Sequence, residues 1–165
     1  MSDASKIDES KLGINPFLDY LRIWAIRVDE SRELFEKDSG VVVSIENKAN
    51  ITTIREYDVE HYFRGFNKSE NRLSVMGLSA KAKDLLWFIV YELKAGRSYV
   101  VVNVKRYLEE VKVSRKTYRR AVLDLIAASI IAPTSITNVF YINPAMFFNG
   151  SRIKKFPEKV LTIER

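Results

Sequence analysis

The sequence predicts an α+β fold, and three patterns in its 165 residues carry that prediction. Short β-branched runs dominate the first third of the chain. Three segments with apolar residues at helical spacing follow between residues 79 and 127. Two more β-branched runs flank the small polar pair Thr137 and Asn138. This order predicts an antiparallel β extension at the N-terminal end, followed by three helices and a β-hairpin.

Changes in composition divide the chain into four predicted regions. An acidic, serine-bearing segment without apolar periodicity is expected to be a flexible arm. A small β-rich extension follows, then the helical domain with its hairpin, and finally a basic tail. The regions are residues 1–13 for the arm, 14–72 for the extension, 73–150 for the domain and 151–165 for the tail.

Within the extension, three runs have the composition of strands. They are residues 21–28, 40–46 and 51–57, and residues 47–50 have the composition of a hairpin turn. Asp58 is expected to cap a short helix through Phe63. The polar residues 66–72 are expected to form a linker.

The three helices are expected to follow Ser79, Asn103 and Ser114, because Ser and Asn cap helix N-termini well. The predicted elements are helices at 79–93, 103–111 and 114–126, a short strand at 99–102, and hairpin strands at 130–136 and 139–142. Val113 and Ser114 form a tight turn between the second and third helices. Two helices joined in this way and followed by a hairpin predict a winged helix-turn-helix, whose third helix enters the DNA major groove.

Helical spacing divides the third helix into two faces. The core face is expected to contain Tyr118, Val122 and Leu125. Arginine on the opposite face can recognise guanine with two hydrogen bonds. That face carries Arg115, Lys116, Arg119 and Arg120, of which Arg120 is expected to pair with Asp124 four residues later.

The remaining candidate DNA contacts are polar groups near this helix, the wing tip and the tail. Hydroxyls at the start of the third helix are expected to contact phosphate or a thymine methyl group, the small polar wing tip to touch the backbone or the minor groove, and the tail to follow phosphates. The candidates are Ser114, Arg115, Lys116, Thr117, Arg119, Arg120, Thr137, Asn138, Arg152 and Lys154, with further phosphate contacts considered for Lys81, Lys83, Lys105 and Arg106.

Positive charge is concentrated in the second half of the chain. Residues 1–78 contain 11 Lys and Arg against 14 Asp and Glu, a balance of −3. Residues 79–165 contain 16 against 7, a balance of +9, and the two balances give the net charge of +6. Clustered cations favour a polyanionic partner because they displace the counterions condensed on phosphates. We therefore expect double-stranded DNA as the partner of the helical domain.

Three segments of the chain resemble RepL-type plasmid replication proteins. The segments are residues 114–120, residues 125–131 and, above all, YINPAMFFNG at residues 141–150. In that family a winged helix is followed by a strand that ends in Ile-Asn-Pro, then by aromatic or aliphatic residues and a glycine. The resemblance covers residues 75–155 and implies DNA binding in the initiation of plasmid or phage replication. It does not extend to the N-terminal extension.

The Asn143-Pro144 pair also has a physical interpretation that needs no family. Proline has no N–H to donate to a neighbouring strand, so Pro144 is expected to end the hairpin strand. Pro144 can start a helical turn that Asn143 caps, which would fold Phe147 and Phe148 back onto the domain.

Several kinds of chemistry find little support in the sequence. The chain has no cysteine, which excludes disulfides and thiolate sites, and no Gly-rich loop with Lys-Ser/Thr, which excludes a P-loop ATPase. Its one histidine, His61, cannot supply the two-histidine metal cluster of rolling-circle nicking enzymes. Asp38 and the run Glu46-Asn47-Lys48 have the spelling of a metal-nuclease motif, but charges near a turn are the expected explanation. We therefore expect a non-enzymatic protein without a cofactor, and we expect Trp24 and Trp87 to lie in the core.

The expected setting is cytoplasmic. The first residues are polar and acidic, unlike a signal peptide, and the longest apolar run, residues 85–91, is too short to span a bilayer. A homodimer is expected if two half-sites are bound, and the extension is expected to recruit a replication or phage protein. The alternatives that remain open are a transcriptional regulator, a phage assembly protein whose winged helix docks protein, and a small nuclease.

Overall fold

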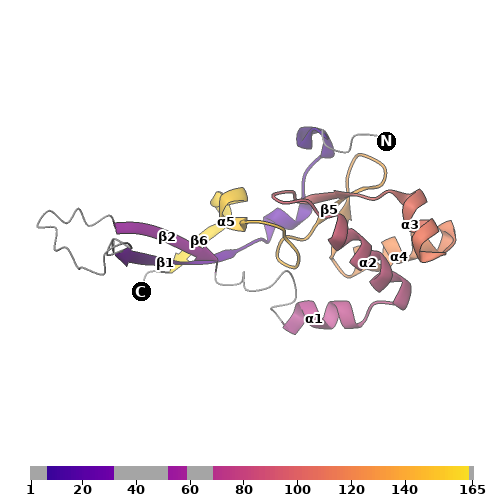
Figure 1. The fold of residues 1–165 in the computed structure, drawn as a ribbon, viewed down its shortest axis with the longest axis horizontal. Helices are drawn as coiled ribbons and strands as arrows, with labels where there is room; N and C mark the ends of the chain where they lie inside the picture. The colour runs from indigo at the N-terminus through magenta and orange to yellow at the C-terminus, as the bar shows by residue number, and fades with distance from the viewer. Residues whose placement is uncertain (1–6, 32–51, 59–68, 164–165) are drawn as a thin grey trace, which may run out of the picture.

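The computed structural model describes residues 7–31, 52–58 and 69–163, and its fold is α+β, as the sequence predicts. A three-stranded sheet lies at one end of the molecule, and helices packed with a second three-stranded sheet lie at the other (Figure 1). The predicted strand 40–46, the turn 47–50 and the helix predicted after Asp58 lie outside the described residues. Within the described ranges, every helix is too short or too polar to cross a membrane.

The first sheet, here called the mixed sheet, combines the extension with the C-terminal segment. It contains β1 (Ile23–Ser31), β2 (Thr52–Asp58) and β6 (Val160–Ile163) in the order β2-β1-β6. β1 and β2 are antiparallel, as predicted, whereas β6 is parallel to β1, with Ile23 opposite Val160. Residues 151–165, predicted to be a tail, therefore form structure through Ile163, because a β-branched run can pair its backbone with the free edge of β1.

A short helix and an apolar cluster join the mixed sheet to the rest of the fold. The helix α5 (Arg152–Lys155) contacts both β1 and β2. The rings of Phe148 and Phe156 have centroids 5.6 Å apart and are buried with Leu21 and Ile23. This cluster holds the base of the mixed sheet against the segment that follows the second sheet.

The three predicted helices are confirmed. They are α2 (Ala80–Glu92), α3 (Val104–Val111) and α4 (Arg115–Ala127). The side chains of the predicted caps Ser79, Asn103 and Ser114 accept hydrogen bonds from backbone amides three residues later. A further helix, α1 (Ser69–Met76), begins inside the segment 66–72 that was predicted to be a linker.

The helices pack on the second sheet and share one core with it. This sheet is antiparallel and contains β3 (Tyr99–Val101), β5 (Val139–Ile142) and β4 (Ile131–Pro133) in the order β3-β5-β4. Buried side chains from α2, α3 and α4 meet in this core, among them Leu85, Tyr107 and Leu125. Trp87 was predicted to lie in the core, but it is exposed on the outer side of α2.

The predicted hairpin is formed by β4 and β5, but β4 is shorter than predicted. It ends at Pro133 rather than at residue 136. The Thr134 hydroxyl accepts a hydrogen bond from the Ile136 amide at 3.1 Å and lies 2.9 Å from the Val139 carbonyl oxygen, which it can donate to. These bonds replace the pairing that a longer strand would make, and they hold the five-residue connection in a compact turn.

The N-terminal segment packs on the hairpin, which corrects the prediction of a flexible arm for residues 7–13. Leu12 is 1% exposed and belongs to a cluster with Tyr99, Val139 and Tyr141. The Tyr141 hydroxyl donates to the Gly13 carbonyl at 2.7 Å, and the Ser135 amide donates to the Leu12 carbonyl at 3.2 Å. Burial of one leucine and satisfaction of its neighbouring carbonyls give this polar segment a fixed position.

The segment after β5 has the role that its sequence predicts. The Asn143 side chain accepts a hydrogen bond from the Ala145 amide at 3.0 Å and donates to the Ser129 carbonyl at 2.9 Å, so it caps the turn at Pro144. Phe147 and Phe148 are both buried, as predicted. The segment ends at Gly150, whose φ of +116° and close approach to the backbone of Gly96 exclude a side chain without strain.

Candidate nucleic-acid interface

The start of α4 is held by a compact turn after α3. Lys112 ends α3 in the left-handed conformation, with φ 53°, and its amide donates to the Leu108 carbonyl. Ser114 then caps α4, because its hydroxyl oxygen accepts a hydrogen bond from the Thr117 amide at 3.1 Å. The hydroxyls of Ser114 and Thr117 also lie 3.0 Å apart, which orients both at the helix N-terminus. Ser114 and Thr117, which the sequence predicts to contact DNA, are therefore both part of the N-terminal cap of α4.

The opposite faces of α4 differ sharply in burial. Tyr118, Ala121 and Leu125 are buried against α2 and the second sheet. The outer face, here called the basic face, consists of Arg115, Lys116, Arg119 and Arg120, all of which are exposed. Within the described part of the chain, none of these four side chains has an ion pair or a side-chain hydrogen bond. The basic face therefore presents four charges to the solvent.

The predicted pair between Arg120 and Asp124 is not formed. The Asp124 carboxylate instead accepts a hydrogen bond at 2.8 Å from the hydroxyl of Ser79, the residue that caps α2. Because an exposed i,i+4 ion pair contributes little, a fixed hydroxyl partner from a packed neighbouring helix can displace it. This contact ties α4 to the start of α2 and leaves the Arg120 guanidinium on the basic face.

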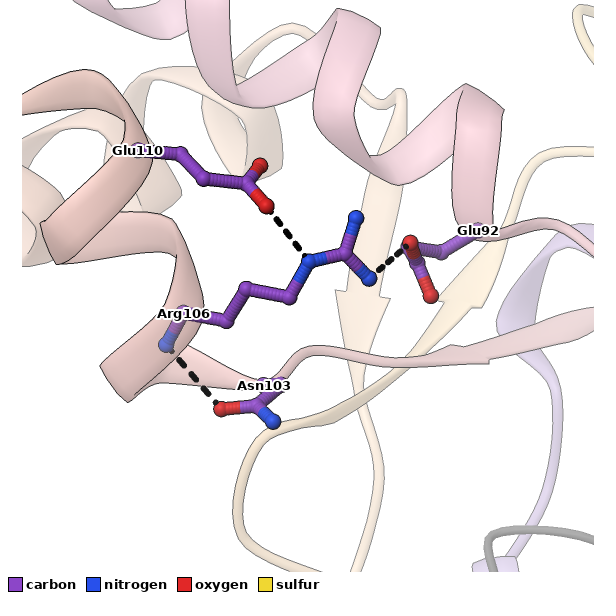
Figure 2. A network of polar contacts seen from close by, with 4 residues as sticks. All are labelled: Glu92, Asn103, Arg106 and Glu110. Carbon is purple, nitrogen blue, oxygen red and sulfur yellow. Dashed lines mark hydrogen bonds and ion pairs between the residues drawn. The ribbon is translucent and has the colours of Figure 1, made fainter.

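Arg106 is engaged within the protein rather than available for phosphate. Its Nε donates to Glu110 at 2.6 Å and its Nη1 to Glu92 at 2.8 Å, which links α3 to the end of α2 (Figure 2). The guanidinium also lies 5.4 Å from the centre of the Phe88 ring. The hydrogen bond to Glu110 and the charge of Glu92 raise the pKa of Arg106. A phosphate would have to compete with two carboxylates for this side chain.

The other lysines considered as phosphate contacts differ in their surroundings. Lys81 forms an ion pair with Asp84 at 3.0 Å, and the Lys83 ammonium donates to the Met76 carbonyl at 3.1 Å. Lys105 is exposed on α3 and has no partner within the described residues. Among these three lysines, Lys105 is thus the one whose ammonium group is best placed to bind a phosphate.

The predicted wing-tip residues are exposed but uncharged. Thr137 and Asn138 lie in the turn between β4 and β5, where Asn138 adopts a φ of 61°. The Asn138 carbonyl accepts a hydrogen bond at 2.8 Å from Val102, which holds the tip against the strand before α3. A neutral, rigid tip can offer hydrogen bonds to a ligand but little electrostatic attraction.

The two predicted tail residues lie apart from the basic face. Arg152 is buried, and its Nη1 donates to the Pro144 carbonyl at 3.2 Å, so it holds α5 against the turn after β5. Its prediction as a DNA contact is corrected on that ground, because a buried guanidinium with an internal partner is not presented to phosphate. Lys154 is exposed, but α5 lies beside the mixed sheet, away from α4 (Figure 1).

Two exposed residues close to the basic face were not predicted. Lys112 lies in the turn that leads into α4, and Leu123 lies on α4 itself. Helical spacing would have found Leu123, since it follows Lys116 by seven residues and Arg120 by three. Lys112 could have been found from its position, because it lies directly before the Val113-Ser114 turn that leads into α4.

No carboxylate cluster suited to a metal ion occurs among residues 7–31, 52–58 and 69–163. Asp38, Glu46 and His61, the residues considered for a nuclease site, lie outside those ranges. Comparisons with protein-family models, with curated proteins and with solved structures find no match to this chain.

Proposed function

We propose that this chain binds double-stranded DNA as a winged helix-turn-helix protein, with α4 in the major groove. In this proposal α3 and α4 are the helix-turn-helix, and the β4–β5 hairpin is the wing. The order of these elements, the compact turn from Lys112 to Ser114 and the packing of α4 on α2 support the assignment.

The observation that carries the proposal is the basic face of α4. Four like charges on adjacent turns of one helix repel one another, and the part of the chain that the structure describes supplies no carboxylate partner for them. Phosphates provide that compensation, and binding then gains from the release of condensed counterions. The inner face of α4 is held by buried Tyr118 and Leu125, so the charges are presented from a rigid support.

Binding and sequence preference can be tested together by selecting bound fragments from a random duplex pool at physiological salt. An enriched sequence is the expected result, and two half-sites separated by about one helical turn would indicate a dimer. If all four cations of the basic face neutralise phosphates, the plot of log affinity against log salt should have a slope of about −3.6. Equal binding to all duplexes would indicate contacts to phosphates alone, and the absence of binding to any duplex would favour a domain that docks protein.

The basic face itself is tested by the double variant Arg115→Ala, Arg119→Ala. Each arginine that contacts a base should contribute about 1–3 kcal/mol, so the double variant should lose at least tenfold in affinity. The matched control is Lys11→Ala, Lys94→Ala, which removes two exposed cations outside α4. If the Arg115→Ala, Arg119→Ala variant binds the selected duplex as tightly as the wild type, the assignment of α4 is wrong.

We further propose replication initiation of a plasmid or phage as the setting, with transcriptional regulation as the alternative use of the same interface. The support is the resemblance of residues 141–150 to RepL-type proteins. The test joins the gene and the selected DNA site to a plasmid that lacks an origin. Replication that depends on both elements is expected, and repression of a reporter without replication would favour the regulator.

A further inference from the structure

Leu123 is an exposed apolar residue on the basic face of α4. Its side chain is 64% exposed, whereas the other large apolar residues of α4 are buried or packed against the core. It follows Arg119 by four residues and Arg120 by three, so it lies one turn further along the same face of the helix. The fold of the chain leaves most of this side chain in contact with solvent.

The surroundings of Leu123 indicate the chemistry of its partner. The cations that share its face favour a polyanion and disfavour an ordinary apolar protein surface, since docking such a surface would bury unpaired charge. In a DNA major groove the exposed apolar group is the C5-methyl of thymine. We propose that Leu123 determines specificity by packing on a thymine methyl group, an inference that rests on the proposed binding of DNA by α4.

Helix geometry limits how far that thymine can lie from the base pairs that the arginines contact. Leu123 follows Arg115 by eight residues, which corresponds to about 12 Å along the helix axis. Successive base pairs are about 3.4 Å apart along the DNA axis, and a helix in the groove is inclined to that axis, so the thymine should lie at most about four base pairs from the pair that Arg115 contacts. The distance from Arg119 is about 6 Å, which corresponds to at most about two base pairs.

The test compares duplexes that differ only in methyl groups. The selected duplex is prepared with thymine, and then with deoxyuridine at single thymine positions, because uracil pairs like thymine and lacks only the methyl group. Wild type should lose about fourfold in affinity at one position, which equals the roughly 0.8 kcal/mol of one buried methyl-sized group. Leu123→Ala should bind the thymine duplex more weakly and should not distinguish it from the uracil duplex.

The matched control is Leu73→Ala, the same substitution at a residue of α1 that is 68% exposed. It should retain the wild-type preference for thymine, and thermal unfolding should show both variants to be as stable as wild type. A wild type that binds the selected duplex but ignores every methyl deletion overturns the inference about Leu123 alone. A Leu123→Ala variant that keeps the full preference does the same. Failure of wild type to bind any duplex overturns the proposed function and this inference together.

Discussion

Replacing Tyr118 by phenylalanine removes one buried hydroxyl from the inner face of α4. The Tyr118 side chain is 6% exposed, and within the described residues its hydroxyl has no hydrogen-bond partner. Its ring lies 5.7 Å from that of Tyr107, and phenylalanine preserves this packing. A buried hydroxyl without a partner costs about 1–3 kcal/mol. Tyr118→Phe should therefore raise the free energy of unfolding at pH 7 by about 1 kcal/mol.

The same residue makes stability depend on alkaline pH. Burial, with a smaller effect of Tyr107, raises the pKa of Tyr118 to about 12 from its ordinary value of 10. The folded state thus favours the protonated phenol. The contribution of this preference to the free energy of unfolding is fully present below pH 10 and is lost as the pH rises through 12. Between these values wild type should lose about 1 kcal/mol per pH unit relative to Tyr118→Phe, because only the unfolded chain releases the proton.

Urea denaturation at pH 7 and pH 11, followed by circular dichroism, measures both effects. Tyr91→Phe is the control, since Tyr91 is 91% exposed on α2 and its substitution should change stability little at either pH. A Tyr118→Phe variant that is less stable than wild type at pH 7 would mean that the hydroxyl has a partner. An unchanged difference between the two proteins at pH 7 and pH 11 would refute the shifted pKa.

Three further predictions concern contacts that hold the helices and the hairpin in place. Leu12→Ala should lower the free energy of unfolding by about 2–5 kcal/mol in urea titrations, since Leu12 is buried against the hairpin, and a smaller change than 1 kcal/mol would contradict its place in the core. Ser114→Ala should cost about 1 kcal/mol in the same assay, because the cap of α4 is lost, and no change would mean that the cap bond contributes nothing. Arg106→Gln should lower the midpoint of thermal unfolding but leave the salt dependence of the proposed DNA binding unchanged, and a shallower slope would show that Arg106 contacts phosphate.

The sequence alone determined the helices α2, α3 and α4 and the division of α4 into two faces. Ser79, Asn103 and Ser114 cap their helices through atoms three residues away, and the spacing of Tyr118, Ala121 and Leu125 repeats within four residues. Such signals depend only on neighbours in the chain, so they survive any tertiary arrangement. The turn at Asn143 was predictable for the same reason, since its cap bond reaches only two residues.

The tertiary structure decided which side chains remain available on the surface. Arg152 has the composition of a solvated tail but is buried on a carbonyl eight residues earlier, and Arg106 binds Glu92 on another helix. β6 pairs with β1 across more than a hundred residues, and Leu12 is buried on a hairpin equally distant in sequence. Whether a side chain is buried, and which strand pairs with which, depends on the segments that pack beside it. Those segments are distant in the sequence, so the local composition does not reveal them. The sequence showed the basic face of α4, but only the fold shows that its four side chains have no ion pair among the described residues and that Leu123 is exposed.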